Sequence, residues 1–548
     1  MVTGYRLPDV ATVDGVDELR AAFEWQIPTE YNIASEVIQW AETDTARTAL
    51  QHVDENGDVH EFSYGELSAA SERLAATLRT NGVSTGDRVA LCAPQSPEAL
   101  SLHLAAYRLG AVIVPVSVLL GNDSVRHVVE TSGARQLWLD SVASERFADV
   151  IDSLDVLPIT FELGANDYDG PDRALGGIRA ATDTERDDSL AATAPDDAAI
   201  FVSTSGTSGQ SKLVVQSHQY LIGSLAGYQL WFELFGDEHT ERVWTPSSWA
   251  WAGALFDVVF PTLAMGGTVC SRVRRSGFDP ETALEYIERA GASRLFVPPT
   301  ALRKIRAGTD PNRFDLSSLN VVLSGGEFLA SDLKAWGEAT LDVTINVGYG
   351  LSEANALIGH CRALYPDRRD SIGVPYPGHD VVIVDEDGET VSVGDTGEIA
   401  LRTPDPVLFK GYWTGDSVEA APDGPLFYTG DRGYRDADGY VYYAGRSDDV
   451  IITSGYRVGP REVERNLEAD SAVREAIVGG VPDDERGERI VAYVVPATDD
   501  PGAVDTDALG RRARDSLGKY KAPHEIHVLS DPAQTHSGKI DRSELFDR

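Results

Sequence analysis

Lysine is scarce in this chain. Only seven of the 47 basic residues are lysines, and 87 acidic residues leave a formal net charge of −40. A surface this acidic repels itself in dilute buffer, whereas molar salt shortens the Debye length to about 3 Å and removes most of the repulsion. We therefore expect a halophilic protein from a salt-rich cytoplasm, with an ordinary acidic protein as the alternative. Nucleic acid and anionic membranes are not expected as partners, because no basic patch is present to neutralise their phosphates.

Cysteines and long apolar runs are also few. The three cysteines lie far apart without metal-ligand spacing, which suits a reducing interior. Residues 99–120 form the longest apolar stretch, but polar residues, glycine and proline interrupt it, so it predicts a helix, a turn and a buried strand. The N-terminus lacks the basic start and apolar stretch of a signal peptide. We expect a cytoplasmic protein without a membrane span.

Helix-like and strand-like segments alternate in two blocks of the chain. Residues 63–81 begin with a capping serine and have apolar residues at helical spacing, and short strand-like segments follow them. A second block, residues 198 to about 402, contains strand-like segments that end in small or polar residues. This pattern predicts an α/β fold with mostly parallel sheets and ligands at the carboxyl ends of the strands. The tail after residue 445 is long enough for a small separate domain.

A loop rich in glycine and hydroxyl groups follows the first strand of the second block. Residues 203–212 have the sequence STSGTSGQSK. Glycines allow close approach of the backbone, hydroxyl and amide groups can bind phosphate oxygens, and the lysine adds a positive charge. The spacing differs from that of a Walker A loop. A flexible linker is the alternative, but the position directly after a buried strand favours a phosphate site.

This loop resembles the Thr-Ser-Gly-Thr-Thr-Gly-x-Pro-Lys signature of the adenylate-forming superfamily of acyl-CoA synthetases, adenylation domains and luciferases. Ser208 replaces the second threonine and keeps its hydroxyl, and Ser211 replaces the proline at a cost only in loop stiffness. The resemblance assigns the binding of ATP phosphates to Thr204, Ser205, Gly206, Thr207, Ser208, Gly209 and Lys212.

Two further segments occur in the order of this family. The segment SGGEF resembles the part that meets the adenine, which assigns Gly326 and Glu327 to nucleotide binding. The segment GYGLSE resembles Tyr-Gly-x-Thr-Glu, so Tyr349 would stack on the adenine, Ser352 would touch the α-phosphate and Glu353 would hold Mg²⁺. A magnesium ion is expected because a triphosphate must lose charge before a carboxylate can attack it. Taken alone, Glu353 would be an ordinary surface acid.

The segments YTGD and AGRSDDV resemble the family's ribose site and domain junction. Asp431 would accept hydrogen bonds from both ribose hydroxyls, and Arg446 would reach the ribose or a phosphate. Asp448 would be the hinge. The resemblance thus predicts a large domain of residues 1–446 and a small mobile domain of residues 447–548.

The tail carries residues that the resemblance assigns to the thiol and to catalysis. In the segment SGYRVGP, Gly455 would leave room for pantetheine and Arg457 would help assemble the thioester-forming state. The segment THSGKIDR resembles Thr-x-Ser-Gly-Lys-Ile-x-Arg, in which Lys539 would bridge the attacking carboxylate and the α-phosphate. Lys539, Ser352 and Glu353 are therefore the expected catalytic residues.

Together the motifs imply a fold and a two-step reaction. The implied large domain consists of stacked αβ sub-domains with mostly parallel sheets and a β-barrel-like part, and the implied small domain is α+β. In the implied reaction a carboxylate and Mg·ATP give acyl-AMP and pyrophosphate, and coenzyme A then displaces AMP. Rotation of the small domain lets one site serve both steps. The sequence leaves the oligomeric state open.

The segment SSWAWAG resembles the acyl-pocket region of medium-chain and acetyl-type acid–CoA ligases. Trp251 corresponds to the pocket wall, although Ser248 stands where these ligases have aspartate. The alternative is that Trp251 is simply an aromatic residue of the hydrophobic core. Acetate-specific relatives have a second tryptophan where this chain has Gly350, so we expect a deeper cavity. The expected substrate is a medium-chain, branched or aryl acid, with acetate or propionate as the alternative.

Two other functions fit the same motifs. A stand-alone adenylation enzyme would load its acyl group onto a carrier protein, but no carrier-domain serine motif is fused to this chain. A non-catalytic nucleotide-binding protein would not need Lys539, Glu353, Asp431 and Arg446 together. The acyl-CoA synthetase remains the favoured prediction.

The net charge predicts that salt stabilises the fold. Raising KCl from low to multimolar concentration should raise the free energy of unfolding, because screening removes repulsion among the acidic side chains. Urea unfolding curves at several KCl concentrations would measure this change. Greater stability in dilute buffer would contradict the prediction.

Overall fold

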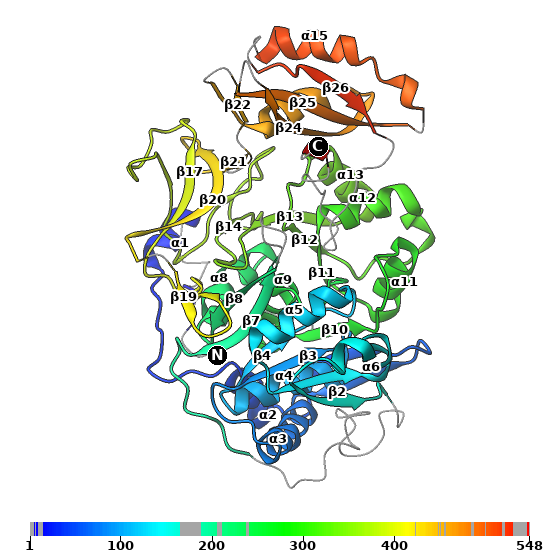
Figure 1. Cartoon of the computed structure of the whole chain (residues 1–548), viewed down its shortest axis with the longest axis vertical. Coiled ribbons are helices and arrows are strands. Elements are labelled where there is room, and N and C mark those ends of the chain that lie inside the picture. Colours follow the sequence, from blue (N-terminus) through cyan, green and yellow to red (C-terminus); the bar gives the residue numbers. More distant parts are fainter. Residues whose placement is uncertain are drawn as a thin grey trace. The chain divides into compact units, whose positions relative to one another are not determined.

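The chain folds into two compact units, which are described separately. The N-terminal unit comprises Met1–His379 and Thr403–Pro425, and the C-terminal unit comprises Asp380–Arg402 and Leu426–Arg548. Figure 1 shows the computed structural model. It describes residues 5, 7–8, 15–164, 188–204, 211–236, 241–421, 423–447, 449, 451–453, 456–483, 487–498, 500–517, 521–529 and 545–546.

One sheet of the N-terminal unit has nine strands and is parallel in its centre. The six strands from β13 to β1 are parallel neighbours, and antiparallel strands complete both edges. In order across the sheet the strands are β15 (Val374–Pro375), β14 (Ile358–Gly359), β13 (Thr344–Tyr349), β12 (Val321–Gly325), β11 (Arg294–Val297), β9 (Arg242–Trp244), β10 (Thr268–Arg272), β1 (Thr48–Val53) and β2 (Val59–Ser63).

The other sheet of this unit has eight strands and joins parallel and antiparallel parts. The strands from β6 to β7 are parallel, whereas β7, β8, β18 and β19 pair antiparallel. In order the strands are β19 (Val418–Ala420), β18 (Gly411–Trp413), β8 (Lys212–Ser217), β7 (Ala198–Thr204), β4 (Val112–Pro115), β3 (Arg88–Cys92), β5 (Gln136–Asp140) and β6 (Leu157–Phe161).

Helices connect and cover these strands, with α11, α12 and α13 beside strands β11 to β13 (Figure 1). After the short α1 (Val16–Ala22), the chain before β6 forms, in order, the helices α2 (Ala34–Thr43), α3 (Tyr64–Thr80), α4 (Pro97–Arg108), α5 (Asn122–Ser132), α6 (Ser141–Arg146) and α7 (Ala148–Ile151). The remaining helices of the unit are α8 (Tyr220–Trp231), α9 (Ala252–Ala254), the π-helix Leu255–Val259, α10 (Phe260–Ala264), α11 (Pro280–Ala290), α12 (Pro299–Gly308), the 3₁₀ turn Pro311–Arg313 and α13 (Ser331–Leu341).

Local sequence signals explain several of these elements. Ser63 caps α3, because its hydroxyl accepts from the Glu66 amide at 3.2 Å while the Glu66 carboxylate accepts from the Ser63 amide at 2.8 Å. The apolar stretch 99–120 forms the end of α4, a turn and strand β4, as the sequence predicts. Every residue of α4 and β4 is buried, so this apolar stretch belongs to the core of the unit.

The C-terminal unit contains two smaller sheets. A four-stranded antiparallel sheet has the order β16-β17-β20-β21 and packs Val382, Val384, Ala400 and Leu426 into a small core. Its strands are β16 (Val381–Val384), β17 (Gly397–Arg402), β20 (Leu426–Arg435) and β21 (Val441–Arg446). Within it β16 pairs with β17, β17 with β20 and β20 with β21. The β-barrel-like part that the resemblance implies for the large domain stays a prediction.

The second sheet of this unit has five strands and two covering helices. The helices α14 (Pro460–Glu468) and α15 (Thr506–Leu517) pack with the strands around one hydrophobic core, as expected for a small α+β domain. The strands are β22 (Ile451–Thr453), β23 (Tyr456–Val458), β24 (Val473–Asp483), β25 (Gly487–Pro496) and β26 (Glu525–Val528), with a 3₁₀ turn at Pro501–Ala503. The predicted hinge residue, Asp448, lies outside the described residues.

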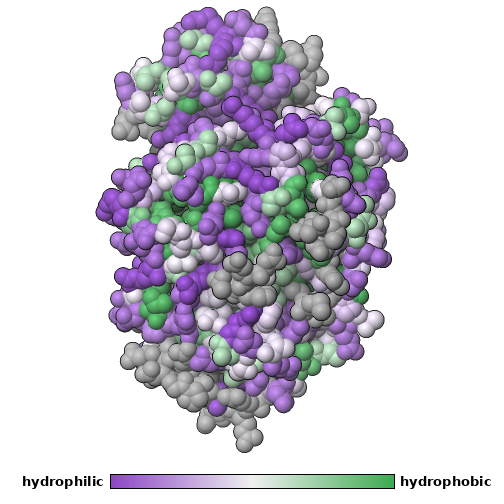
Figure 2. All heavy atoms as spheres, turned by 180° about the vertical axis from the view of Figure 1, so that it is seen from behind, coloured by the Kyte–Doolittle hydropathy of each residue, from purple (hydrophilic) through white to green (hydrophobic). Residues whose placement is uncertain are grey.

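The face of the molecule in Figure 2 is largely hydrophilic. Hydrophobic residues occur between the hydrophilic ones in scattered groups. Within the described ranges, no helix has both the length and the apolar character needed to cross a bilayer.

Candidate active site

Strands β7 and β8 form the hairpin that carries the predicted phosphate loop. Thr204 ends β7 and pairs with Lys212, which begins β8, so the two ends of the loop lie opposite each other. The side chain of His127 lies 2.8 Å from the carbonyl oxygen of Ser211, next to Lys212. The other predicted loop residues lie outside the described part of the chain: Ser205, Gly206, Thr207, Ser208 and Gly209.

A tyrosine that the sequence analysis missed links this loop to the predicted magnesium ligand. The Nζ atom of Lys212 lies 4.8 Å from the ring centroid of Tyr412, a cation–π contact. The hydroxyl of Tyr412 donates to Glu353 Oε1 at 2.7 Å. Tyr412 lies on β18 opposite Val214 of β8, so sheet pairing fixes its position. Its position on a neighbouring strand could not be read from the spacing of the motifs.

The backbone around Ser352 and Glu353 is fixed by the same region. Gln216 on β8 donates from Nε2 to the carbonyl oxygen of Ser352 at 2.6 Å. The amide of Phe409 donates to the carbonyl oxygen of Glu353 at 2.8 Å. These bonds bring two predicted catalytic residues, which follow β13, next to the hairpin of the phosphate loop. Both Ser352 and Glu353 are partly exposed, as a site that binds a ligand requires.

Strands β12 and β13 approach closely at the adenine segment. Gly325 pairs with Gly348, and a Cβ on Gly325 would lie 2.6 Å from the Gly348 carbonyl oxygen, so only glycine fits. Gly326 follows in a left-handed conformation with φ of 83°. The next residue, Glu327, has its carboxylate held by α12: Thr300 donates to its two oxygens at 2.9 and 2.8 Å, and Arg303 at 2.8 Å.

Asp431 and Arg446 lie opposite each other on the hairpin of β20 and β21 in the C-terminal unit. Arg446 Nη1 is 3.6 Å from Asp431 Oδ1, and Tyr443 donates to the same oxygen at 3.5 Å. The side chain of Asp431 is nearly buried, whereas that of Arg446 is 42% exposed. A carboxylate oriented by a tyrosine and an arginine is suited to a vicinal diol, which supplies two hydrogen-bond donors.

Three predicted residues of the tail fall outside the described residues: Asp448, Gly455 and Lys539. Arg457 lies on strand β23, which pairs with β22, but its side chain is not among those described. Their assigned roles therefore stay predictions.

Trp251 and Gly350, the two predicted residues of the acyl pocket, have different surroundings. Trp251 caps the N-terminus of α9 and is partly exposed, unlike the buried Trp249. A Cβ on Gly350 would lie 2.6 Å from the amide nitrogen of Ala356, so backbone packing requires glycine here. Backbone packing alone therefore explains why residue 350 is glycine. The deeper cavity stays a prediction.

A buried carboxylate lies between these two segments. Asp257 in the π-helix accepts a hydrogen bond from Asn355 Nδ2 at Oδ1. Burial raises the pKa of the Asp257 carboxyl to about 7, although the bond from Asn355 opposes this shift. The π-helix is a rare form that occurs frequently at functional sites. The sequence motifs gave no role to either residue.

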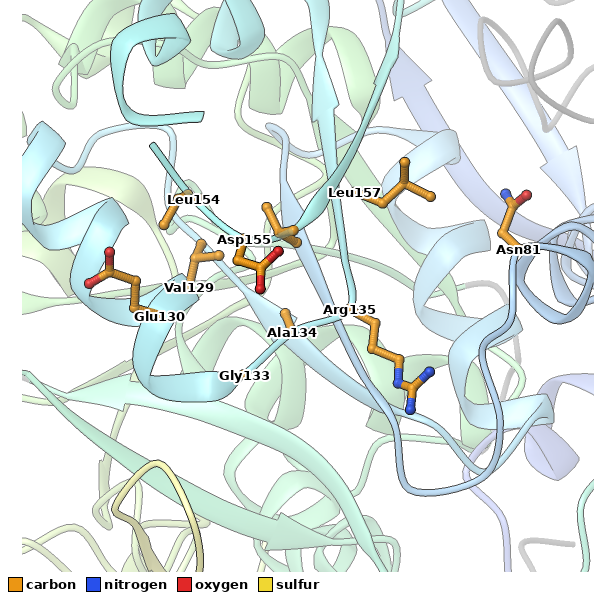
Figure 3. A pocket seen from close by; sticks show the side chains of 10 residues that line it. Asn81, Val129, Glu130, Gly133, Ala134, Arg135, Leu154, Asp155 and Leu157 are labelled. Atoms are coloured by element: carbon orange, nitrogen blue, oxygen red, sulfur yellow. The ribbon is translucent and has the colours of Figure 1, made fainter. Parts of the chain in front are cut away.

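Other parts of the described structure carry less chemistry. Within these residues no group of three or more histidine, cysteine or acidic side chains could hold a metal. A Mg²⁺ ion bound by one carboxylate, phosphate oxygens and water does not need such a group. An open hollow of about 550 Å³ elsewhere is lined by no predicted site residue. Figure 3 shows side chains that line it, among them Val129, Arg135 and Leu157.

Comparison with known proteins identifies the class of the chain. The AMP-binding enzyme family matches residues 37–413, and the AMP-binding enzyme C-terminal domain matches residues 462–539. An uncharacterized acyl–CoA ligase, YtcI of Bacillus subtilis (strain 168), is 31% identical over 527 residues, 95% of this chain and 96% of its own. The mitochondrial acyl-coenzyme A synthetase ACSM3 of Mus musculus is 27% identical over 558 residues, covering 99% and 94%.

Solved structures give the same class. An acyl-CoA synthetase of Brucella canis has a TM-score of 0.73 at 28% identity, over 98% of this chain and 99% of that chain. ATP-bound MatB from Rhodopseudomonas palustris has a TM-score of 0.80 at 25% identity, over 94% and 98%. The fold and the enzyme class are therefore those of an AMP-forming acyl-CoA synthetase. The chain belongs to the AMP-binding enzyme family, whose acyl-CoA synthetases use ATP, Mg²⁺ and coenzyme A. The predicted fold class and enzyme class are confirmed.

The hydrogen bond from Tyr412 to Glu353 leads to a testable prediction about the dependence of activity on Mg²⁺. Tyr412→Phe should lower kcat/KM and raise the Mg²⁺ concentration for half-maximal activity, because a hydrogen bond to a carboxylate contributes about 1.5–3 kcal/mol, roughly tenfold or more. Magnesium titrations of wild type and variant would measure the shift. Tyr442→Phe, which removes a tyrosine bond to the Asp436 carboxylate, is the matched control. Equal magnesium dependence in all three proteins would contradict the role of Tyr412.

Proposed function

We propose that this chain activates a medium-chain, branched or aryl carboxylic acid as its acyl-adenylate and transfers the acyl group to coenzyme A. The observation that carries the proposal is the contact chain Lys212–Tyr412–Glu353, in which segments of two different sheets meet. A cation such as Lys212, close to a carboxylate that can bind Mg²⁺ such as Glu353, suits a nucleoside triphosphate. ATP and the acid would therefore bind at the carboxyl ends of β7 and β13.

Each predicted site residue has its own role in adenylation. Lys212 and the loop before it hold the β- and γ-phosphates, and Glu353 holds the magnesium ion that neutralises the charge near the α-phosphate. Tyr349 stacks on the adenine, and Asp431 accepts from the ribose hydroxyls. Lys539 stabilises the negative charge that develops between the acid and the α-phosphate. Pyrophosphate leaves and acyl-AMP stays bound.

Thioester formation uses the other orientation of the C-terminal residues. Residues 447–548 turn about Asp448, so that Lys539 leaves and Gly455 lines the path of the pantetheine thiol. Arg457 helps to assemble this state. The thiol sulfur attacks the acyl carbon, the bond to phosphate breaks, and AMP leaves. The reaction proceeds in the salt-rich cytoplasm that the acidic composition suits.

The residues of the predicted acyl pocket indicate the class of acid. Trp251 is partly exposed at the start of α9, which supports its place in a pocket wall. A tryptophan presents a large flat apolar face, which suits an alkyl chain or an aromatic ring. Acetate would leave most of such a surface uncovered.

A panel of acids tests this function. CoA-dependent release of AMP, measured in molar KCl with acids from acetate through decanoate and benzoate, should be fastest for a medium-chain, branched or aryl acid. The reason is that each buried methylene adds about 0.8 kcal/mol of transfer free energy. Acetate as the best substrate by roughly tenfold would contradict the assigned acid, since tenfold corresponds to about 1.4 kcal/mol. Release of AMP with no acid at all would contradict the function.

Lys539→Ala tests the division between the two half-reactions. The variant should lose adenylation, measured by pyrophosphate exchange, because Lys539 stabilises charge only in that step. Supplied acyl-AMP and coenzyme A should still give thioester at close to the wild-type rate. The nearby Lys521→Ala, which removes a lysine paired with Glu462, is the control and should affect neither step. Equal loss of both half-reactions in Lys539→Ala would show that its assigned role is wrong.

A further inference from the structure

Asp257 and Asn355 join the two chain segments that form the predicted acyl pocket. Asp257 lies in the π-helix Leu255–Val259, which continues the segment that begins at Trp251. Asn355 lies in the loop after Gly350, and its Cα would be 3.0 Å from a Cβ on that glycine. Both side chains are buried, with 8% and 7% of the residue surface exposed. The hydrogen bond between them therefore lies between the two pocket walls.

The second oxygen of Asp257 lies beside Gly253, which has no side chain to cover it. A Cβ added to Gly253 would lie 3.0 Å from Asp257 Oδ2 and 3.4 Å from Cε1 of Phe296. One acceptor oxygen and one aromatic edge thus border the same spot, two residues after Trp251. Ligand pockets have this composition, mostly apolar with a few placed polar groups that fix orientation.

Above its raised pKa of about 7, Asp257 is a buried carboxylate, and this charged form needs a further partner. Its one described hydrogen bond, from Asn355, goes to Oδ1. Burying a carboxylate without compensating hydrogen bonds costs several kcal/mol. An alkyl chain or unsubstituted ring against Oδ2 would remove its remaining access to water and return no hydrogen bond. A hydroxyl or amino group on the ligand would supply the missing donor.

We propose that Asp257, oriented by Asn355, selects carboxylic acids that carry a hydroxyl or amino group on the chain or ring, remote from the reacting carboxylate. This inference rests on the proposed function, because it takes the space beside Trp251 as the acyl pocket. It narrows the substrate from any medium-chain or aryl acid to one with a hydrogen-bond donor. Sites that bond a substrate donor discriminate strongly against the analogue that lacks it, because the polar group of the protein is then left unpaired.

Matched pairs of acids test the selectivity. We would measure kcat/KM for CoA-dependent AMP release in molar KCl with 3-hydroxybenzoate against benzoate, 3-aminobenzoate against benzoate, and 6-hydroxyhexanoate against hexanoate. The wild type should favour at least one donor-bearing acid over its parent by about tenfold or more. Asp257→Leu, which removes both oxygens at similar size, should lower that ratio to about one.

A second variant keeps the Asp257 carboxylate and covers its second oxygen, Oδ2, with a methyl group. Gly253→Ala places a methyl group 3.0 Å from Oδ2 and should lower the same ratio at least about threefold, since the donor can no longer approach. Gly510→Ala in α15, where a Cβ would meet only Ile526 at 3.7 Å, is the matched control and should keep the wild-type ratio.

The outcomes separate this inference from the proposed function. Wild-type ratios below about tenfold for every pair overturn the selectivity while AMP release supports the ligase. A ratio that Asp257→Leu leaves unchanged also overturns it, and if that variant does not fold, the ratio in Gly253→Ala decides. Failure to release AMP with any acid would overturn the proposed function itself, and the selectivity with it.

Discussion

The pairing of β18 with β8 is the contact on which the geometry of the site depends. The phosphate loop belongs to the eight-stranded sheet, and the loop with Ser352 and Glu353 follows β13 of the nine-stranded sheet. Strand β18 brings Tyr412 to the Glu353 carboxylate, and the residues just before it supply the amide of Phe409 to the Glu353 carbonyl. Strand β18 thus connects the eight-stranded sheet to the loop that follows β13. This is the place where a triphosphate and its metal would bind.

The extreme acidity of the chain makes its few lysines informative. Within the described residues, Lys410, Lys334 and Lys521 pair with carboxylates, whereas Lys212 forms no ion pair there and lies over the ring of Tyr412. A lysine held by an aromatic face keeps its charge available, because a ring quadrupole neutralises less of it than a carboxylate would. In a protein with a net charge of −40, such a cation gives an anionic ligand a local attraction that the overall field opposes.

The sequence predicted the strands of the fold well because the pattern of each strand is local. Strands that end in small or polar residues, such as β12 and β7, have a pattern that adjacent residues define, and the structure confirms them. Tyr412 and Asn355 could not be found in this way, because their roles depend on partners 59 and 98 residues away.

Gly350 shows how a sequence argument and a packing argument can compete for one residue. The absence of a side chain would by itself enlarge the predicted pocket, but the backbone of Ala356 fills the direction in which that side chain would point. In the proposed acyl pocket, the shape would then be set mainly by the segment that runs from Trp251 through Gly253 to Asp257. Asp257 follows Gly253 by four residues, the spacing of neighbours on one helix face, and its Oδ2 lies 3.0 Å from the position that a Cβ of Gly253 would take. The proposed selectivity accordingly belongs to that segment, and the loop after β13 contributes Asn355, which orients Asp257.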